Sequence, residues 1–425
     1  MVTHEKATNA PSVEPLDEEL QMFFYGNHSI CLWKAATSGP YLSDNEGDTM
    51  VLRCHMIAPI TAFLLMLAPS GQQPPAHPRP SATFEALSRQ AVAARDAGHL
   101  NEAVALFKKA LKERPDWDEG WWNVGSIAYD RDQYIECAQS FEQLTVLKPD
   151  SAPAWTMSGL CEYQLRNFDS AVRSLQQAER LSFQGPRELS ASGRLHLALV
   201  LIKTGKFEKA INVLSDLTKF DRKTSEIIVA AGIAGLRQPW LPSEVPESER
   251  AKVMQLGGAM ATGMELDVKD AIAQFEAVVQ QFPNDPNVHF RFGAFLMQQT
   301  PDRGLAELKK TLELDPEYIQ ALVGFAMIYL NRGDPQTALE YAERAVKASP
   351  TDFGPHVALG RALLALNDDA GAAKELEIAV NIEPGNSDAH FSLASAYSHL
   401  GRKEDAQREH EEFKRLKKLI DSSQP

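Results

Sequence analysis

Residues 119–149 read "EGWWNVGSIAYDRDQYIECAQSFEQLTVLKP", a pattern that predicts two helices joined by a turn. The first half places one helical face at i, i+3, i+4 and i+7, formed by Trp121, Val124, Gly125 and Ala128. "RDQ" is a polar turn. The second half carries apolar residues at helical spacing, namely Ile135, Ala138, Phe141, Leu144 and Leu147. Pro149 ends the second helix, because proline cannot donate the next helical hydrogen bond. We expect Gly125 and Cys137 to let the two helices approach closely.

The same pattern returns every 34 residues along most of the chain. Trp121 and Trp155 are 34 residues apart, as are Gly125 and Gly159. Pro316, Pro350 and Pro384 repeat at the same spacing, and one step of 33 separates Pro283 from Pro316. A helix pair of this size cannot bury its apolar face alone, so neighbouring pairs must stack into a continuous core. The period therefore predicts an all-α solenoid.

The slots resemble those of the tetratricopeptide repeat (TPR) family, whose pattern spans 34 residues. In one unit the resemblance rests on Trp121, Val124, Gly125, Phe141 and Pro149. In another it rests on Leu322, Phe325, Ala326, Tyr329, Ala338, Ala345 and Pro350. The resemblance implies a right-handed superhelix of about nine units: 84–117, 118–151, 152–185, 191–224, 252–284, 285–318, 319–352, 353–386 and 387–420.

The repeat is interrupted at residues 225–251, which divide the array into a first sub-array (84–224) and a second (252–420). "SEIIVAAGIAGLR" predicts a lone helix, and the prolines of "QPWLPSEVPESER" break the helical pattern after it. The segment is either a spacer that redirects the array or a loop whose Trp240 contacts a ligand or the other sub-array. The last unit ends in a charged capping helix, followed by a tail at 421–425.

In the TPR family the first helices of the units line a concave groove that holds a segment of a partner. The residue after the Trp121 slot, and residues about one and two turns beyond it, are expected to face that groove. The candidate residues are Trp122, Ser126, Tyr129, Thr156, Leu160, Tyr163, Leu195, Leu199, Val323, Met327, Val357, Arg361 and Phe391. They are mostly apolar or aromatic, which favours a peptide or helix with apolar side chains. The alternative is that they pack against neighbouring helices.

No pattern in the chain indicates catalysis, a cofactor or a metal site. Phosphate-binding glycine loops and a nucleophile elbow are missing from the sequence. His356 and His390 occupy the slot of Trp121 and Trp155 in their units, so we interpret them as packing rings. Cys137 and Cys161 fall in helix-packing slots, where two buried thiols are the default and a disulfide is the alternative for an exported protein.

The charge balance argues against two classes of partner. The formal net charge is −14, and no basic patch accompanies it. Phosphate groups and anionic membrane surfaces are bound by lysine and arginine clusters, so nucleic acid is not expected as a partner. A protein or peptide partner remains, and the sequence does not specify an oligomeric state.

The residues before the array resemble a targeting segment preceded by an extension. Residues 1–49 show no sustained periodicity, and we interpret them as an unstructured or mis-called extension. Residues 50–70, beginning at Met50, contain the apolar run "MIAPITAFLLMLA" (56–68), which has the length of a signal-peptide core and is too short for a membrane-spanning helix. Residues 71–83 are a Pro-rich linker. We expect export to the periplasm or the extracellular space, and a cytoplasmic protein if the signal is not used.

These patterns predict a non-enzymatic scaffold for protein–protein interaction that binds a partner segment in the groove. A periplasmic chaperone-like or assembly factor that holds exported clients is the alternative. Suppression of client aggregation without a fixed stoichiometry would distinguish the second function from the first.

Overall fold

The computed structural model describes residues 81–220 and 224–422. The extension 1–49, the signal segment 50–70, most of the linker 71–83 and the last residues of the tail lie outside them. Within the described ranges the regular elements are helices and no strand occurs, which confirms the expected all-α class. The described chain forms two compact units, residues 81–120 and residues from Trp121 onward.

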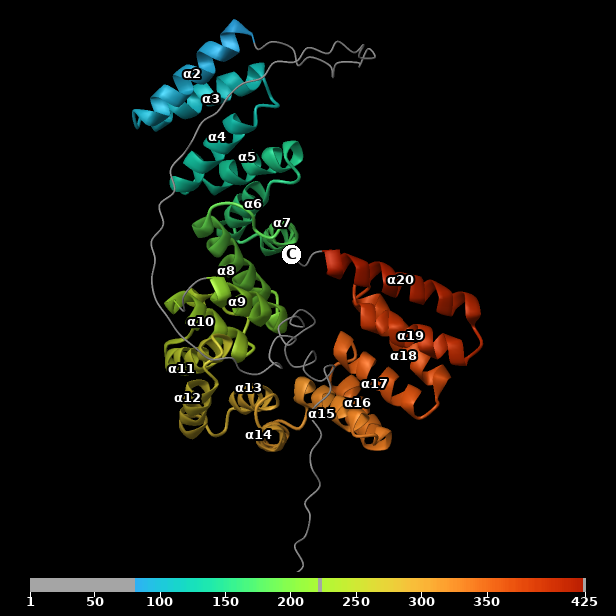
Figure 1. Ribbon diagram of the computed structural model, residues 1–425. Helices are drawn as coiled ribbons and strands as arrows, with labels where there is room; N and C mark the ends of the chain where they lie inside the picture. Colours follow the sequence, from blue (N-terminus) through green and yellow to red (C-terminus); the bar gives the residue numbers. More distant parts are fainter. Residues whose placement is uncertain (1–80, 221–223, 423–425) are drawn as a thin grey trace, which may run out of the picture. The chain divides into compact units, whose positions relative to one another are not determined.

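Consecutive helices form nine pairs, interrupted once by the lone helix α10, as the period predicted (Figure 1). The pairs are α2 (Ala82–Asp96) and α3 (Leu100–Glu113), α4 (Asp118–Asp130) and α5 (Tyr134–Leu147), α6 (Ala152–Gln164) and α7 (Phe168–Arg180), α8 (Arg187–Lys203) and α9 (Phe207–Phe220), α11 (Glu247–Met264) and α12 (Val268–Gln281), α13 (Pro286–Leu296) and α14 (Pro301–Leu314), α15 (Ile319–Asn331) and α16 (Pro335–Ala348), α17 (Phe353–Ala365) and α18 (Asp369–Ile382), and α19 (Ser387–His399) and α20 (Lys403–Ser422).

Residues 81–120 contain one complete helix pair with its own aromatic contacts. The Ser81 hydroxyl accepts a hydrogen bond from the Phe84 amide at 3.1 Å and so caps the start of α2. The Trp117 ring packs edge-on against Phe84, with centroids 5.2 Å apart, and lies 5.6 Å from the ring of Phe107. This small unit therefore buries a core of its own.

A glycine on the first helix receives a large side chain from the second helix of the same unit. A methyl group placed on Gly125 would lie 2.7 Å from a Phe141 ring carbon, and one on Gly159 would lie 2.5 Å from Leu175 Cγ. These approaches explain why the glycines repeat with the period. Cys137 is also fully buried, but Ile135 is 66% exposed and lies off the packed face.

The interruption between the sub-arrays is a helix followed by a loop. Helix α10 (Ser225–Gly235) is followed by residues 236–246, which include the short 3₁₀ turn η1 (Pro242–Glu244), and α11 begins at Glu247. A methyl group on Gly232 would lie 1.9 Å from the Val253 carbonyl oxygen. Glycine is therefore required there, because the backbones of α10 and α11 touch.

One charged cluster links three helices on both sides of this interruption. The Glu208 carboxylate on α9 accepts two hydrogen bonds from Arg291 on α13, at 2.9 and 3.0 Å, and one from Arg237 at 2.7 Å. Burial would raise the pKa of Glu208, but the two guanidinium groups outweigh it and lower that pKa. Arg291 also donates to the Gly235 carbonyl at 3.3 Å, so the cluster holds the end of α10 as well.

None of the helices over 81–220 and 224–422 combines the length and the apolar character that a membrane crossing requires.

Candidate functional site on the first helices

The candidate groove residues lie on the first helices of five units, but they differ in burial. Thr156, Leu160, Leu199, Val323 and Met327 are at most 6% exposed, so a partner cannot reach their side chains in this structure. The half-buried ones are Trp122, Ser126, Tyr129, Tyr163, Leu195, Val357 and Arg361. Phe391 is 51% exposed. The accessible candidate surface is therefore these eight residues, and most of its area is aromatic or apolar.

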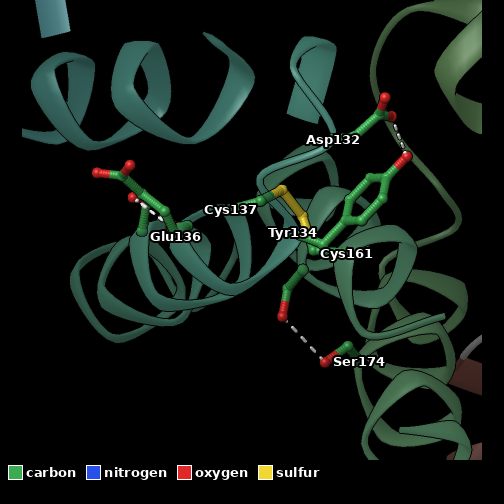
Figure 2. The surroundings of a disulfide bond; sticks show 8 residues. Asp132, Tyr134, Glu136, Cys137, Cys161 and Ser174 are labelled. Atoms are coloured by element: carbon green, nitrogen blue, oxygen red, sulfur yellow. Dashed lines mark hydrogen bonds between the residues drawn. A yellow bond between two sulfur atoms is a disulfide. The ribbon is translucent and has the colours of Figure 1, made fainter. Parts of the chain in front are cut away.

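On α4 the candidate rings are supported by rings from α5. Trp122 meets Phe141 edge-on at 5.3 Å between centroids, and Tyr129 meets Tyr134 at 5.8 Å. The Tyr134 hydroxyl donates to Asp132 in the preceding turn (Figure 2), and this bond raises the pKa of the phenol to about 12. Trp122 thus contributes to the core of its unit while part of its ring stays accessible.

Tyr163 on α6 lies where the loop between the sub-arrays reaches the first sub-array. Its ring meets His196 edge-on at 4.8 Å and lies 6.3 Å from Phe168. Burial is the main reason why the pKa of Tyr163 is raised, and the negative charge of Glu244 adds to it. The loop therefore contributes to the surroundings of this candidate residue.

Glu244 holds the loop on the first sub-array. Its carboxylate accepts hydrogen bonds from Arg166 at 2.5 Å, Lys203 at 2.7 Å and the amide of Leu241 at 2.9 Å. The Lys203 bond is the largest cause that lowers the pKa of Glu244 to about 2. Trp240 is half-buried against a core cluster that contains residues of both sub-arrays, from Ala171 to Leu296. This placement makes Trp240 part of the junction.

Phe391 is the most exposed candidate. Its ring lies 5.3 Å from that of Phe413 on α20, and His410 stacks on the other side of Phe413 at 5.9 Å. A large apolar side chain that is half exposed and backed by a second ring is a natural contact for an apolar partner group.

The structure joins Cys137 of α5 and Cys161 of α6 by a disulfide, with Cα atoms 5.9 Å apart (Figure 2). Both residues are fully buried. Of the two alternatives that the sequence left open, the structure has the cross-link. It connects the second helix of one unit to the first helix of the next unit.

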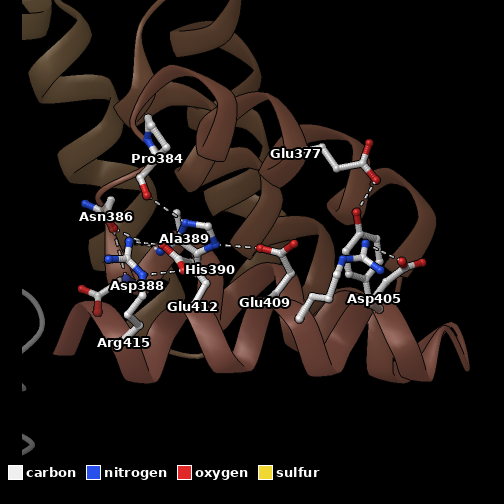
Figure 3. A network of polar contacts seen from close by, with 12 residues as sticks. Glu377, Pro384, Asn386, Asp388, Ala389, His390, Asp405, Glu409, Glu412 and Arg415 are labelled. Carbon is white, nitrogen blue, oxygen red and sulfur yellow. Dashed lines mark hydrogen bonds and ion pairs between the residues drawn. The ribbon is translucent and has the colours of Figure 1, made fainter. Parts of the chain in front are cut away.

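His356 and His390 lie in packing slots, as expected, but they also make polar contacts. His356 Nδ1 lies 2.7 Å from Glu375 Oε2, and its Nε2 lies 2.9 Å from the Pro350 carbonyl oxygen. His390 makes the same contacts with Glu409 at 2.7 Å and Pro384 at 3.1 Å (Figure 3). Each ring therefore links its first helix to the second helix and to the end of the preceding unit.

His289 is a third member of this set that the sequence analysis did not identify. Its Nδ1 lies 2.6 Å from Glu307 Oε2 and its Nε2 lies 2.9 Å from the Pro283 carbonyl oxygen. The signal was present, because His289 and His356 are separated by one step of 33 and one of 34. The slipped step hid it from a search at the regular period.

Over the described ranges, no group of three or more His, Cys, Asp or Glu side chains is arranged to hold a metal ion. The buried imidazoles are already bonded to acceptors of their own units. The accessible chemistry of the first helices is therefore that of a binding surface, with rings backed by rings and few charges.

Several proteins are similar to this chain in sequence. The Arabidopsis thaliana protein named "Protein CTR9 homolog" is 23% identical over 65% of this chain, and the matched region is 26% of the plant protein. "BBSome complex member BBS4" of Bos taurus is 20% identical over 78% of the chain and 64% of its own length. The "Peroxisomal targeting signal receptor" of Pichia angusta is 34% identical, over 21% of the chain and 18% of the receptor. The chain thus spans less than two thirds of the length of each of these relatives.

Among solved structures, MamA from Desulfovibrio magneticus RS-1 is 20% identical, with a TM-score of 0.34, and covers 40% of this chain and 96% of its own. The family model described as "Tetratricopeptide repeat" matches residues 88–152, 156–223, 294–353 and 357–410, which together are more than half of the chain. With helix pairs at a period of 34 and the glycine slots filled as described, this chain belongs to the tetratricopeptide repeat family.

Proposed function

We propose that this protein is a non-enzymatic interaction scaffold that binds an apolar segment of a partner protein on its first-helix surface. The observation that carries the proposal is the exposed Phe391, repeated in register by the half-buried Val357 on the preceding unit. Apolar side chains presented at a fixed spacing on successive helices suit a partner that is extended or helical. Relatives described as a targeting-signal receptor and as a member of a complex are consistent with a binding role.

We further propose that the protein works outside the cytoplasm. The apolar run at 56–68 has the length of a signal-peptide core. The disulfide between Cys137 and Cys161 supports the same location, because disulfides persist in oxidising compartments. Peptide mapping of the native protein under non-reducing conditions tests both points, and free Cys137 and Cys161 in the native protein would argue against export.

Site-specific crosslinking tests the binding surface. A photoreactive residue at position 391 samples the candidate surface, and one at position 135 is the matched control, because Ile135 is equally apolar and 66% exposed but lies on a second helix. In cells that make the full chain, we expect one defined protein to be captured from position 391 and not from position 135. Equal capture from both positions, or capture from position 135 alone, would contradict the proposal.

A chaperone-like factor is the second candidate, and the half-buried aromatic surface favours it equally. The captured proteins separate the two functions. A scaffold yields one partner at fixed stoichiometry, whereas a holding factor yields many exported clients at position 391.

A further inference from the structure

We propose that the second sub-array contains a proton-dependent stabilising device, in which His289, His356 and His390 clamp the helices of their units only while an extra proton is bound. The device goes beyond a binding scaffold, because it makes the stability of one half of the array depend on pH.

The geometry requires one more proton per clamp than a neutral histidine and an ionised glutamate hold. In each clamp, Nδ1 faces a glutamate oxygen at 2.6–2.7 Å and Nε2 faces a carbonyl oxygen at 2.9–3.1 Å. A neutral imidazole has one donor and one acceptor nitrogen, and an ionised carboxylate only accepts. Both contacts are therefore satisfied only when the ring is doubly protonated or the proton sits on the glutamate. Loss of that proton leaves a lone pair facing a carboxylate.

Burial prevents water from replacing the lost hydrogen bond. The side chains of the three histidines are 4–6% exposed, and their glutamate partners are 15–24% exposed. An unsatisfied polar pair in such a place costs more than it would at the surface. The clamp must therefore weaken or rearrange after it loses its proton.

The first sub-array has the same link without the proton. The indole N–H of Trp155 donates to the Pro149 carbonyl at 2.9 Å, which is the bond that Nε2 makes in the clamps. In that unit the position nineteen residues after the ring is Ser174, whose hydroxyl is 3.2 Å from that of Ser158. Tryptophan is thus paired with serine where histidine is paired with glutamate. Leu322 fills the slot in the unit 319–352 and is fully buried.

The charges near the clamps are few and mostly favour the proton. Glu307 holds His289, and Lys310 further along α14 opposes the proton there. Glu375 holds His356 from α18. Near His390, Glu409 bonds the ring, while Glu412 lies close enough to interact and is itself paired with Arg415 (Figure 3).

The sign of the pH dependence follows from these contacts. The hydrogen bond to Glu307 raises the pKa of His289, although burial acts in the opposite direction. A raised pKa in the folded state means stability that is fully present below the unfolded value and is lost as the pH rises through the folded value. The second sub-array is therefore most stable at mildly acidic pH and loosens above neutrality.

Hydrogen exchange of the full chain, corrected for intrinsic rates, tests this device between pH 5.5 and 8.5. We expect protection in α13–α14 and α17–α20 to fall with pH by up to about tenfold per pH unit for each clamp that loses its proton. Protection in α6–α7, which contain the Trp155 slot, should stay level. An equal fall in both sub-arrays, or a flat profile in both, would overturn the proposal.

Transplanting the slot sharpens the test. The double variant His356→Trp with Glu375→Ser copies the Trp155 and Ser174 pair, and it should abolish the pH dependence of α17–α18 while α13–α14 keep theirs. An unchanged slope in α17–α18 of a folded variant would contradict the role of His356. If the variant does not fold, ¹⁵N spectra of histidine-labelled wild-type protein decide the question. Doubly protonated rings at pH 6 support the clamps, and neutral rings at pH 6 with ionised glutamates refute them.

Discussion

Trp155 in the first sub-array and His356 in the second occupy the same position of the repeat, yet different chemistry holds them. Each ring donates to the carbonyl of the proline six residues earlier, at 2.9 Å. Trp155 makes that bond at an exposed site, and its unit is cross-linked to the preceding unit by a disulfide. His356 adds a buried contact with Glu375. One half of the array is thus held by a covalent bond and the other by shared protons, although the packing slots are the same.

The largest effect is expected where the two halves meet, because the backbones of α10 and α11 touch there. Gly232→Ala would place a methyl group 1.9 Å from the Val253 carbonyl oxygen, so the helices must separate. We expect a loss of roughly 3 kcal/mol in the free energy of unfolding measured in urea. Gly258→Ala on α11 is the matched control, since its methyl group would meet only Gln274 Oε1 at 3.6 Å. That variant should be neutral or gain about 0.5–1 kcal/mol. Equal losses in both variants would show that helix propensity, and not the contact, explains the glycine.

The next effect isolates the first sub-array. Replacing Cys137 and Cys161 by alanine removes a cross-link between residues 24 apart, which is expected to cost about 2–4 kcal/mol. Hydrogen exchange should show the loss in α4–α7, and a reductant should reproduce it in the wild-type protein. The second sub-array contains no cysteine, so protection in α15–α18 provides an internal control. Loss of protection in α15–α18 of the same size would mean that the two halves unfold as one.

The repeat could be predicted from the sequence because each unit reports its own slots. Trp121 and Gly125 reappear at Trp155 and Gly159, and local spacing is enough to place both helices of a unit. The confirmed array therefore needed no long-range information. The contacts of Gly125 with Phe141 follow the same rule, since both residues belong to one unit.

The accessible part of the candidate surface could not be predicted in the same way. Val323 and Trp122 share a register position, but Val323 is 2% exposed and Trp122 is half-buried. Exposure depends on which neighbouring helix or loop covers each residue, and the period carries no such information. The bond between Glu208 and Arg291 joins residues 83 positions apart across the interruption, where the register is lost.

A smaller difference compares the two rings directly. His356→Phe removes two hydrogen bonds and leaves the Glu375 carboxylate without its imidazole, whereas Trp155→Phe removes one exposed bond. We expect the histidine change to cost about 2 kcal/mol more at pH 6, and the tryptophan change to cost about 1 kcal/mol. Urea unfolding at pH 6 and at pH 8.5 checks this comparison. The extra cost of His356→Phe should shrink at pH 8.5, and an unchanged gap at the two pH values would show that shape alone fills the slot.

The smallest effect concerns the loop that Glu244 holds on the first sub-array. Glu244→Gln keeps the shape but removes the charge that Arg166 and Lys203 bind. Arg166 is 58% exposed, so solvent screens the pair and the change in global stability should stay below about 1 kcal/mol. Hydrogen exchange in residues 237–246 should rise several-fold, while α15–α18 stay unchanged. The pKa of Glu244 is lowered to about 2, so the wild-type loop should loosen only as the pH falls from about 4.5 toward 2. The clamps of the second sub-array respond at the opposite end of the pH scale. If Glu244→Gln left exchange in 237–246 unchanged, Trp240 and Leu241 packing would be sufficient to hold the loop.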